Sequence, residues 1–159
     1  MNSIMRDYYP IFEMYQALRS QLMDLLDDMD LAFSPAGDNP SLGALCREIG
    51  EVQSAYIRSF STFEMDLSYR YEDAAIAGSV SRLVDWFARL DAELKDVVAG
   101  LSDEDIVGRK IVRGPDFELL PLIQLDVYKE ALLIFYAKVS VYLRLMGKEL
   151  PQQWVDWIG

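Results

Sequence analysis

The sequence predicts an all-α protein, a single four-helix bundle with long crossover connections. Four long segments repeat apolar residues at three- and four-residue intervals, which is the spacing of one helix face. Two of the three connections between these segments are long, as is typical of bundles that use crossovers instead of simple hairpins. The chain has 159 residues, 52% of them hydrophobic, so we expect one core and one domain spanning residues 1–159.

The first helix is predicted to start near Asp7 or Pro10, because proline is accepted in a first turn, and to run to Met29. The charged residues Glu13, Arg19, Asp24 and Asp27 lie off its apolar face. The connection Ala32–Pro40 is short enough to join an antiparallel pair of helices. The predicted apolar face consists of Ile11, Met14, Tyr15, Leu18, Leu22, Leu25, Leu26 and Met29.

The second helix should follow Ser41, whose hydroxyl is a good N-cap, and its apolar face extends to Phe60. The third helix is predicted over Ser79–Ala99, with Gly100 at its C-terminal end. Between these helices lies the first long connection, Glu64–Gly78. It is long enough to carry the chain along the bundle, so we expect a crossover here.

The fourth helix is predicted over Leu119–Met146 and is apolar on more than one face. Such a helix is either central in the bundle or uses its second face to contact another subunit. In the connection before it, Leu101–Glu118, Ser102 begins a capped helical turn and Gly114 marks a hairpin-like excursion.

Two tryptophans, Trp154 and Trp157, stand three residues apart near the C-terminus. On a short helix they would either cover the end of the bundle or anchor an interface between subunits. Together with the second apolar face of the fourth helix, they lead us to expect a homodimer.

The composition excludes several classes of function. With 26 acidic and 15 basic residues the net charge is −11, which argues against binding nucleic acid or anionic membranes. We expect neither a signal peptide nor a membrane span, because no apolar run approaches about 20 residues. The chain has no histidine, so Ser-His-Asp catalysis, Cys-His catalysis and any imidazole ligand are excluded. The lone cysteine, Cys46, suits a reducing cytoplasm, and we expect it to be buried and inert.

Three segments resemble the DinB/YfiT-like superfamily: SLGALCREIGEV at residues 41–52, FELL at 117–120, and VYLRLMG at 141–147 with Pro151 beyond. The resemblance covers nearly the whole chain. It implies a four-helix bundle with crossover connections that often forms homodimers. In that family many members hold nickel or zinc on three histidines, and some use the metal in thiol-dependent transfer.

The resemblance places the three histidine positions on Glu48, Ala131 and Phe135. Two of these side chains are hydrocarbon, so it implies a dismantled metal site, and we predict neither a metal nor another cofactor. We expect the ring of Phe135 to fill the volume of the metal. Tyr56 and Tyr128 are expected to line any pocket that remains around Glu48. A filled site would indicate a scaffold, and an open one a pocket for an amphipathic or cationic small molecule.

The leading functional hypothesis is therefore a non-catalytic, homodimeric interaction or small-ligand-binding module. The alternative is a thiol-dependent transferase that uses Glu48 as its acid or base. The side chain of Glu48 either points into the bundle or leans into solvent. A third functional hypothesis is a metal site formed by the carboxylates of Glu48 and of Asp126 or Glu130. We interpret the remaining charged groups as solvated or paired within the chain. They are the pair Glu48 and Glu51 and the basic loop residues Arg109, Lys110 and Arg113.

Overall fold

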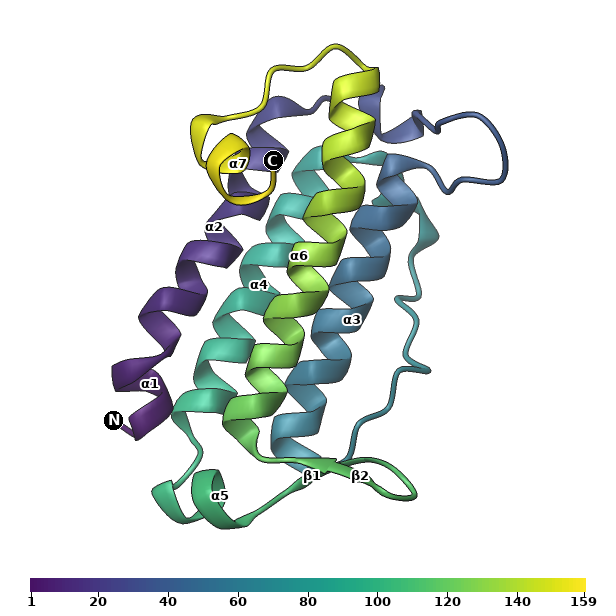
Figure 1. The fold of residues 1–159 in the computed structure, drawn as a ribbon. Coiled ribbons are helices and arrows are strands. Elements are labelled where there is room, and N and C mark those ends of the chain that lie inside the picture. Colours follow the sequence, from purple (N-terminus) through teal and green to yellow (C-terminus); the bar gives the residue numbers. More distant parts are fainter.

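The computed structural model describes residues 1–159 and confirms the all-α bundle. Its four long helices are α2 (Tyr9–Leu25), α3 (Leu42–Thr62), α4 (Val80–Ala99) and α6 (Pro121–Leu145) (Figure 1). Helix α3 packs against both α4 and α6, and α2 closes the bundle by contacting the same two helices from the other side. No helix combines the length and the apolar character that crossing a bilayer requires.

Shorter elements cover the ends of the bundle. Helix α5 and a two-stranded antiparallel hairpin occupy the end at which α4 finishes, and α7 lies at the opposite end (Figure 1). The short elements are α1 (Ser3–Asp7), the 3-10 turns η1 (Asp30–Ala32) and η2 (Ala74–Gly78), α5 (Asp103–Gly108), β1 (Ile111–Gly114), β2 (Phe117–Leu119) and α7 (Gln152–Trp157).

Only one of the two long connections is a crossover. Helices α3 and α4 run in the same direction, so residues 63–79 return along the length of the bundle, whereas residues 100–120 stay at one end (Figure 1). The carboxylate of Glu51 on α3 holds the returning segment. It accepts a hydrogen bond from the backbone N–H of Tyr71 at 2.9 Å and pairs with Arg47 at 2.9 Å.

The helix caps predicted from the sequence are present. The hydroxyl of Ser41 accepts the backbone N–H of Ala44 at 3.1 Å, and α4 ends with Gly100 as its C-cap. Ser102 and Asp105 form a reciprocal capping box at the start of α5. The predicted hairpin-like excursion is the pairing of β1 with β2.

The first long helix differs from the prediction at both ends and on its buried face. A separate helix, α1, precedes it, and it stops at Leu25 rather than Met29. The carboxylate of Asp27 accepts backbone N–H groups of Met29 and Asp30, which offers the chain an alternative to continuing the helix. Three residues assigned to the apolar face are exposed instead, namely Ile11, Met14 and Met29.

Two glycines allow α3 to approach its neighbours closely. A Cβ atom on Gly50 would lie 2.3 Å from the ring of Trp86 on α4, and one on Gly43 would lie 1.8 Å from the carbonyl oxygen of Ala77. A larger residue at either position would therefore separate the packed elements. The close packing of α3 against α4 depends on the absence of a side chain at Gly50, and its packing against η2 depends on the absence of one at Gly43.

The C-terminal segment is a lid within the subunit. Trp154 on α7 is fully buried, its ring centre is 5.1 Å from that of Tyr136, and its indole N–H donates to the carbonyl oxygen of Leu18 at 3.0 Å. Trp154 therefore covers the end of the bundle within its own subunit, which is one of the two roles expected for the tryptophans. Trp157 packs on Tyr15 and remains partly exposed.

Replacing Trp154 with phenylalanine should lower the free energy of unfolding by about 1–3 kcal/mol, because it removes the indole hydrogen bond and part of the buried volume. Urea denaturation followed by circular dichroism measures the change. Trp157→Phe is the matched control and should change the free energy by less than about 1 kcal/mol. Equal effects of the two substitutions would contradict the lid.

Candidate functional site

A groove of about 150 Å³ lies between α3 and α6 at the positions that the sequence singled out. Glu48 on α3 and Ala131 and Phe135 on α6 all line it. Ala131 and Phe135 share a face because they are four residues apart on a helix. The remaining lining residues are Leu45, Ile49, Val52, Ile134 and Lys138.

The groove is mostly apolar, with one charge of each sign. Phe135 is largely buried, yet its ring does not fill the space, as the residual volume shows. Glu48 is exposed and leans into solvent instead of entering the core. Lys138 contributes an exposed ammonium group from α6. The groove therefore offers an apolar floor with a carboxylate and an amine beside it.

Tyr56 and Tyr128 do not line this groove, and that expectation was wrong. Both are buried, with ring centres 4.9 Å apart, in the core of the bundle. Tyr56 is eight residues beyond Glu48 on α3, which is roughly 12 Å along the helix axis at 1.5 Å per residue. The Tyr128 hydroxyl has no hydrogen-bond partner, and burial raises the pKa of Tyr128 well above its ordinary value.

Of the other carboxylates proposed near Glu48, Glu51 and Asp126 are engaged elsewhere, and Glu130 is exposed and does not line the groove. Glu51 faces the crossover segment through its contacts with Arg47 and Tyr71. Asp126 accepts a hydrogen bond from the hydroxyl of Tyr8 at 2.6 Å and forms an ion pair with Lys129, which lowers the pKa of the Asp126 carboxyl. No three carboxylate or thiol side chains lie close enough together to hold a metal ion.

The donor set of the groove does not fit the nickel or zinc site that the family resemblance implies. Such a site needs three converging nitrogen, sulfur or oxygen ligands. Of the three positions, Glu48 alone carries a donor atom, and its side chain is exposed. The methyl group of Ala131 and the phenyl ring of Phe135 offer none.

A buried polar cluster joins α2, α3 and α4, and the sequence analysis missed it. Arg19 lies off the predicted apolar face of the first helix, yet its side chain is only 2% exposed. Its guanidinium donates to Asp91 Oδ1 at 2.5 Å and to Gln53 Oε1 at 2.6 Å, and it lies 4.1 Å from the centre of the Phe87 ring. The amide of Gln16 also donates to Asp91 Oδ1, at 2.8 Å.

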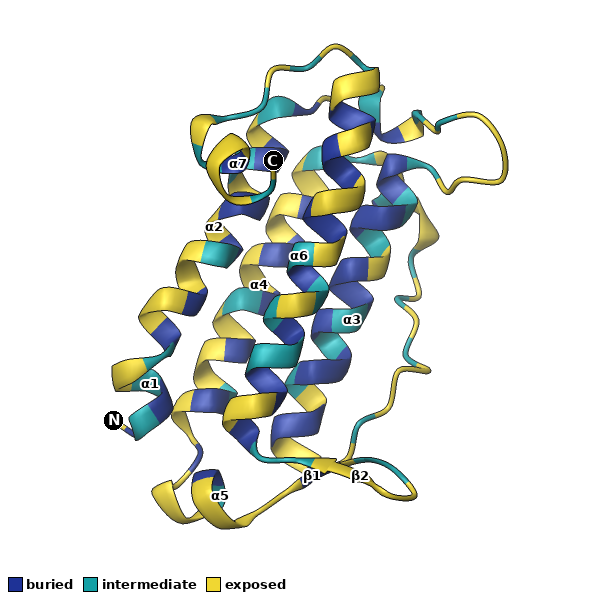
Figure 2. Ribbon diagram, in the orientation of Figure 1, coloured by how far each residue is buried: buried dark blue, intermediate teal, exposed yellow.

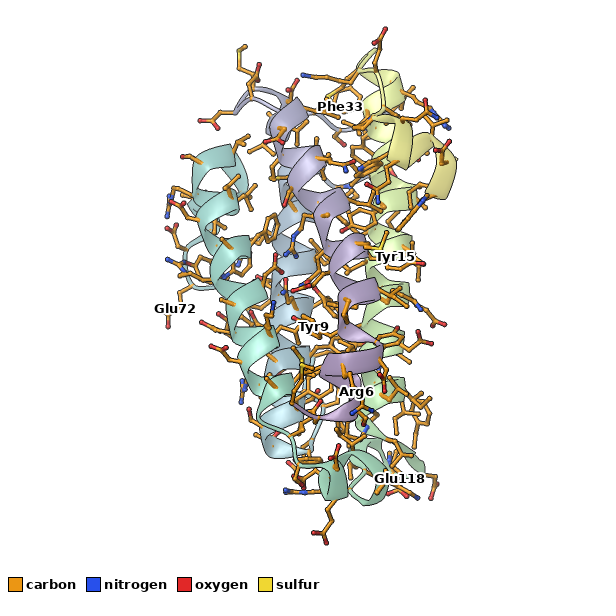
Figure 3. The ribbon with its side chains drawn as sticks, turned by 90° about the vertical axis from the view of Figure 1, so that its left-hand side faces the viewer. Arg6, Tyr9, Tyr15, Phe33, Glu72 and Glu118 are labelled. Carbon is orange, nitrogen blue, oxygen red and sulfur yellow. The ribbon has the colours of Figure 1, made fainter.

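Figure 3 shows α2 in front, between α4 on one side and α6 on the other, so that its inner face is covered by both. The signal for the buried cluster was a second helical stripe on α2, whose members are Phe12, Gln16, Arg19 and Met23. These positions are three or four residues apart, but two are polar and did not count toward an apolar face. A hollow of about 170 Å³ lies beside Arg19 and Asp91, between α2 and α4.

The lone thiol and the basic loop have structural roles. Cys46 is fully buried, as expected, and burial raises the pKa of its thiol to about 12. Arg109 stacks 3.6 Å from the centre of the Phe63 ring, and Lys110 pairs with Glu118. Arg113 donates to Gln124 Oε1 at 2.7 Å. The basic cluster is thus used within the subunit.

Comparison with known proteins identifies the family. The sequence model of the DinB superfamily matches residues 12–125, which is more than half of the chain. The crystal structure of a DinB-like protein from Bacillus subtilis, YjoA, superposes with a TM-score of 0.68 over 88% of this chain and 92% of that chain. Its sequence is 15% identical, so this likeness concerns the fold. The search of curated proteins finds no match. The chain belongs to the DinB superfamily.

Proposed function

We propose that this DinB-superfamily protein is a non-catalytic, homodimeric module that binds a small amphipathic molecule in the groove between α3 and α6. The observation that carries the proposal is the groove itself, an open volume of about 150 Å³ at the positions of Glu48, Ala131 and Phe135. An apolar cavity of about this size holds a molecule as large as benzene. A ligand with one ring or a short alkyl chain therefore suits it.

The chemistry of the lining suggests how such a ligand would lie. Its apolar part would cover Leu45, Ile49 and Phe135, removing their surfaces from water. Its polar end would remain near the exposed carboxylate of Glu48, which forms no ion pair within the subunit. We therefore propose an amphipathic ligand with a cationic end. The single reduced thiol of Cys46 fits a cytoplasmic location.

Thiol-dependent transfer, the second function considered, finds less support in these residues. Cys46 cannot supply the thiolate, because its sulfur is fully buried and its pKa is raised to about 12. A transferase of this type would have to take its thiol from solution and use Glu48, in contact with water, as its base. The apolar groove favours binding over proton transfer.

Nuclear magnetic resonance titration with n-hexylammonium and hexanoate tests the proposal. We expect hexylammonium to shift the amide signals of residues 45–52 and 131–138 and to bind more tightly than hexanoate. Ala131→Trp should abolish the shifts by filling the groove, and Glu48→Gln should weaken binding about three- to tenfold. Glu149→Gln, an exposed carboxylate outside the groove, is the control. Preference for hexanoate, or equal binding to the Ala131→Trp variant, would overturn the proposal.

A further inference from the structure

One face of α6 is apolar and has no partner within the subunit. Four large side chains on it are substantially exposed: Ile123 by 46%, Ile134 by 59%, Val141 by 51% and Leu145 by 60%. Figure 2 shows exposed positions recurring along α6 on the side turned to the viewer. Steps of 11, 7 and 4 residues separate them in sequence, and at about 100° per residue these steps keep all four within one narrow stripe.

Apolar residues stand at equal distances in sequence before and after Ile134. Ile123 stands 11 residues before Ile134 and Leu145 stands 11 after it. Val141 stands 7 residues after Ile134, and Val127, a half-buried residue in line with the stripe, stands 7 before it. If a second copy of α6 lies antiparallel, with a two-fold axis beside Ile134, every apolar residue of the stripe meets an apolar residue. Such self-complementarity is what an isologous interface requires.

The charges follow the same symmetry. Glu130 stands 4 residues before Ile134 and Lys138 stands 4 after it, so the antiparallel arrangement brings opposite charges to the same level. Both are exposed, and neither forms an ion pair within its subunit. Other charges on α6 are satisfied internally, since Lys129 pairs with Asp126 and Arg144 donates to the carbonyl oxygen of Gly159.

We propose that the partner of this face is a second copy of the chain, docked antiparallel along α6 with Ile134 on the two-fold axis. Glu130 then pairs with Lys138 of the partner subunit, and Lys138 with Glu130 of the partner subunit. Both apolar stripes leave water, which supplies the driving force. The inference rests on the homodimer of the proposed function and specifies its geometry.

The arrangement also affects the groove. Ile134 of the stripe and Lys138, one turn beyond it, both line the groove. A partner helix on the stripe therefore closes one side of each groove and neutralises Lys138. Glu48 remains as the unpaired charge, which is why the ligand's end would be cationic. The binding site is completed by the second subunit.

Disulfide cross-linking tests the geometry, because the only native thiol, Cys46, is buried. Under mild oxidation Ile134→Cys should give a covalent dimer in high yield, since this residue faces its own copy. Val141→Cys should not link to itself, because the two copies would lie about 14 residues, or roughly 21 Å, apart along the helices. Mixed with Val127→Cys it should give a dimer. Met29→Cys, exposed but outside the stripe, is the control.

Charge reversal provides a second measurement. Glu130→Lys and Lys138→Glu should each weaken dimerisation about tenfold in analytical ultracentrifugation, since two ion pairs become repulsive. The double variant should restore it. A monomer at all concentrations would refute the homodimer as well as this geometry. A stable dimer in which Ile134→Cys fails to link, or Val141→Cys links to itself, would refute the geometry alone.

Discussion

Replacing Asp91 with alanine should lower the free energy of unfolding by about 3 kcal/mol, although Asp91 is a partly exposed residue on α4. The substitution leaves the guanidinium of Arg19 buried without a counter-charge, and removing one partner of a buried pair is strongly destabilising. Gln16 and Gln53 also lose the acceptor that their amides share with Arg19. The loss of stability comes from three groups that no longer have Asp91 as an acceptor: the guanidinium of Arg19 and the side-chain amides of Gln16 and Gln53.

Urea denaturation of matched variants measures this effect. Asp85→Ala, an exposed residue on the same helix, should change the free energy by less than about 0.5 kcal/mol. The double variant Arg19→Met/Asp91→Leu should recover much of the loss, because apolar replacements of a buried pair are often tolerated. If Asp91→Ala is as stable as the wild type, burying the charged guanidinium of Arg19 does not require the contact with Asp91.

The second large effect is a gain of metal binding. The triple variant Glu48→His/Ala131→His/Phe135→His should bind one nickel or zinc ion with a dissociation constant in the micromolar range, about −8 kcal/mol of binding free energy. The three positions line one groove, so three imidazoles placed there converge, with open coordination positions facing solvent. The wild type should show no stoichiometric binding.

Isothermal titration calorimetry of protein purified without a histidine tag makes this comparison. The chain has no native histidine, so the background is low. Circular dichroism must first show that the variant is folded, because Phe135 is largely buried. The double variant that keeps Glu48 should bind more weakly. A folded triple variant with no gain in metal affinity would refute the placement of the family's ligand positions on these residues.

The sequence predicted those parts of the fold that depend on local signals. Ser41, Ser79 and Ser102 stand at helix starts, and Gly100 stands at a helix end. The pairing of polar side chains across three helices was not predictable, because it depends on which faces meet. Arg19 was therefore placed only off the apolar face of the first helix, because an arginine is rarely buried unless it has a partner, and the sequence does not show that partner.

The positions of some candidate-site residues could be predicted, whereas the binding of a ligand there stays a prediction. Glu48, Ala131 and Phe135 share one groove, as their spacing and the family resemblance indicated. Tyr56 and Tyr128 were placed there because they lie near Glu48 and Ala131 on the same helices. Tyr56 lies about two turns beyond Glu48, and Tyr128 lies about one turn before Ala131. Residue spacing gives direction and distance along a single helix, but the side chains that line a shared groove depend on how two helices pack together. The volume left beside Phe135 could not be read from the sequence, because it depends on the separation of α3 and α6.

Because Cys46 is buried, its reaction with a thiol reagent can report transient opening of the bundle. The sulfur of Cys46, in the second turn of α3, is fully buried and can react with an aromatic disulfide reagent only while the bundle opens. The labelling rate therefore measures how often the bundle opens, and no reporter group has to be introduced. Rates that fall when the groove is occupied would register ligand protection directly, even for a compound that gives no optical signal.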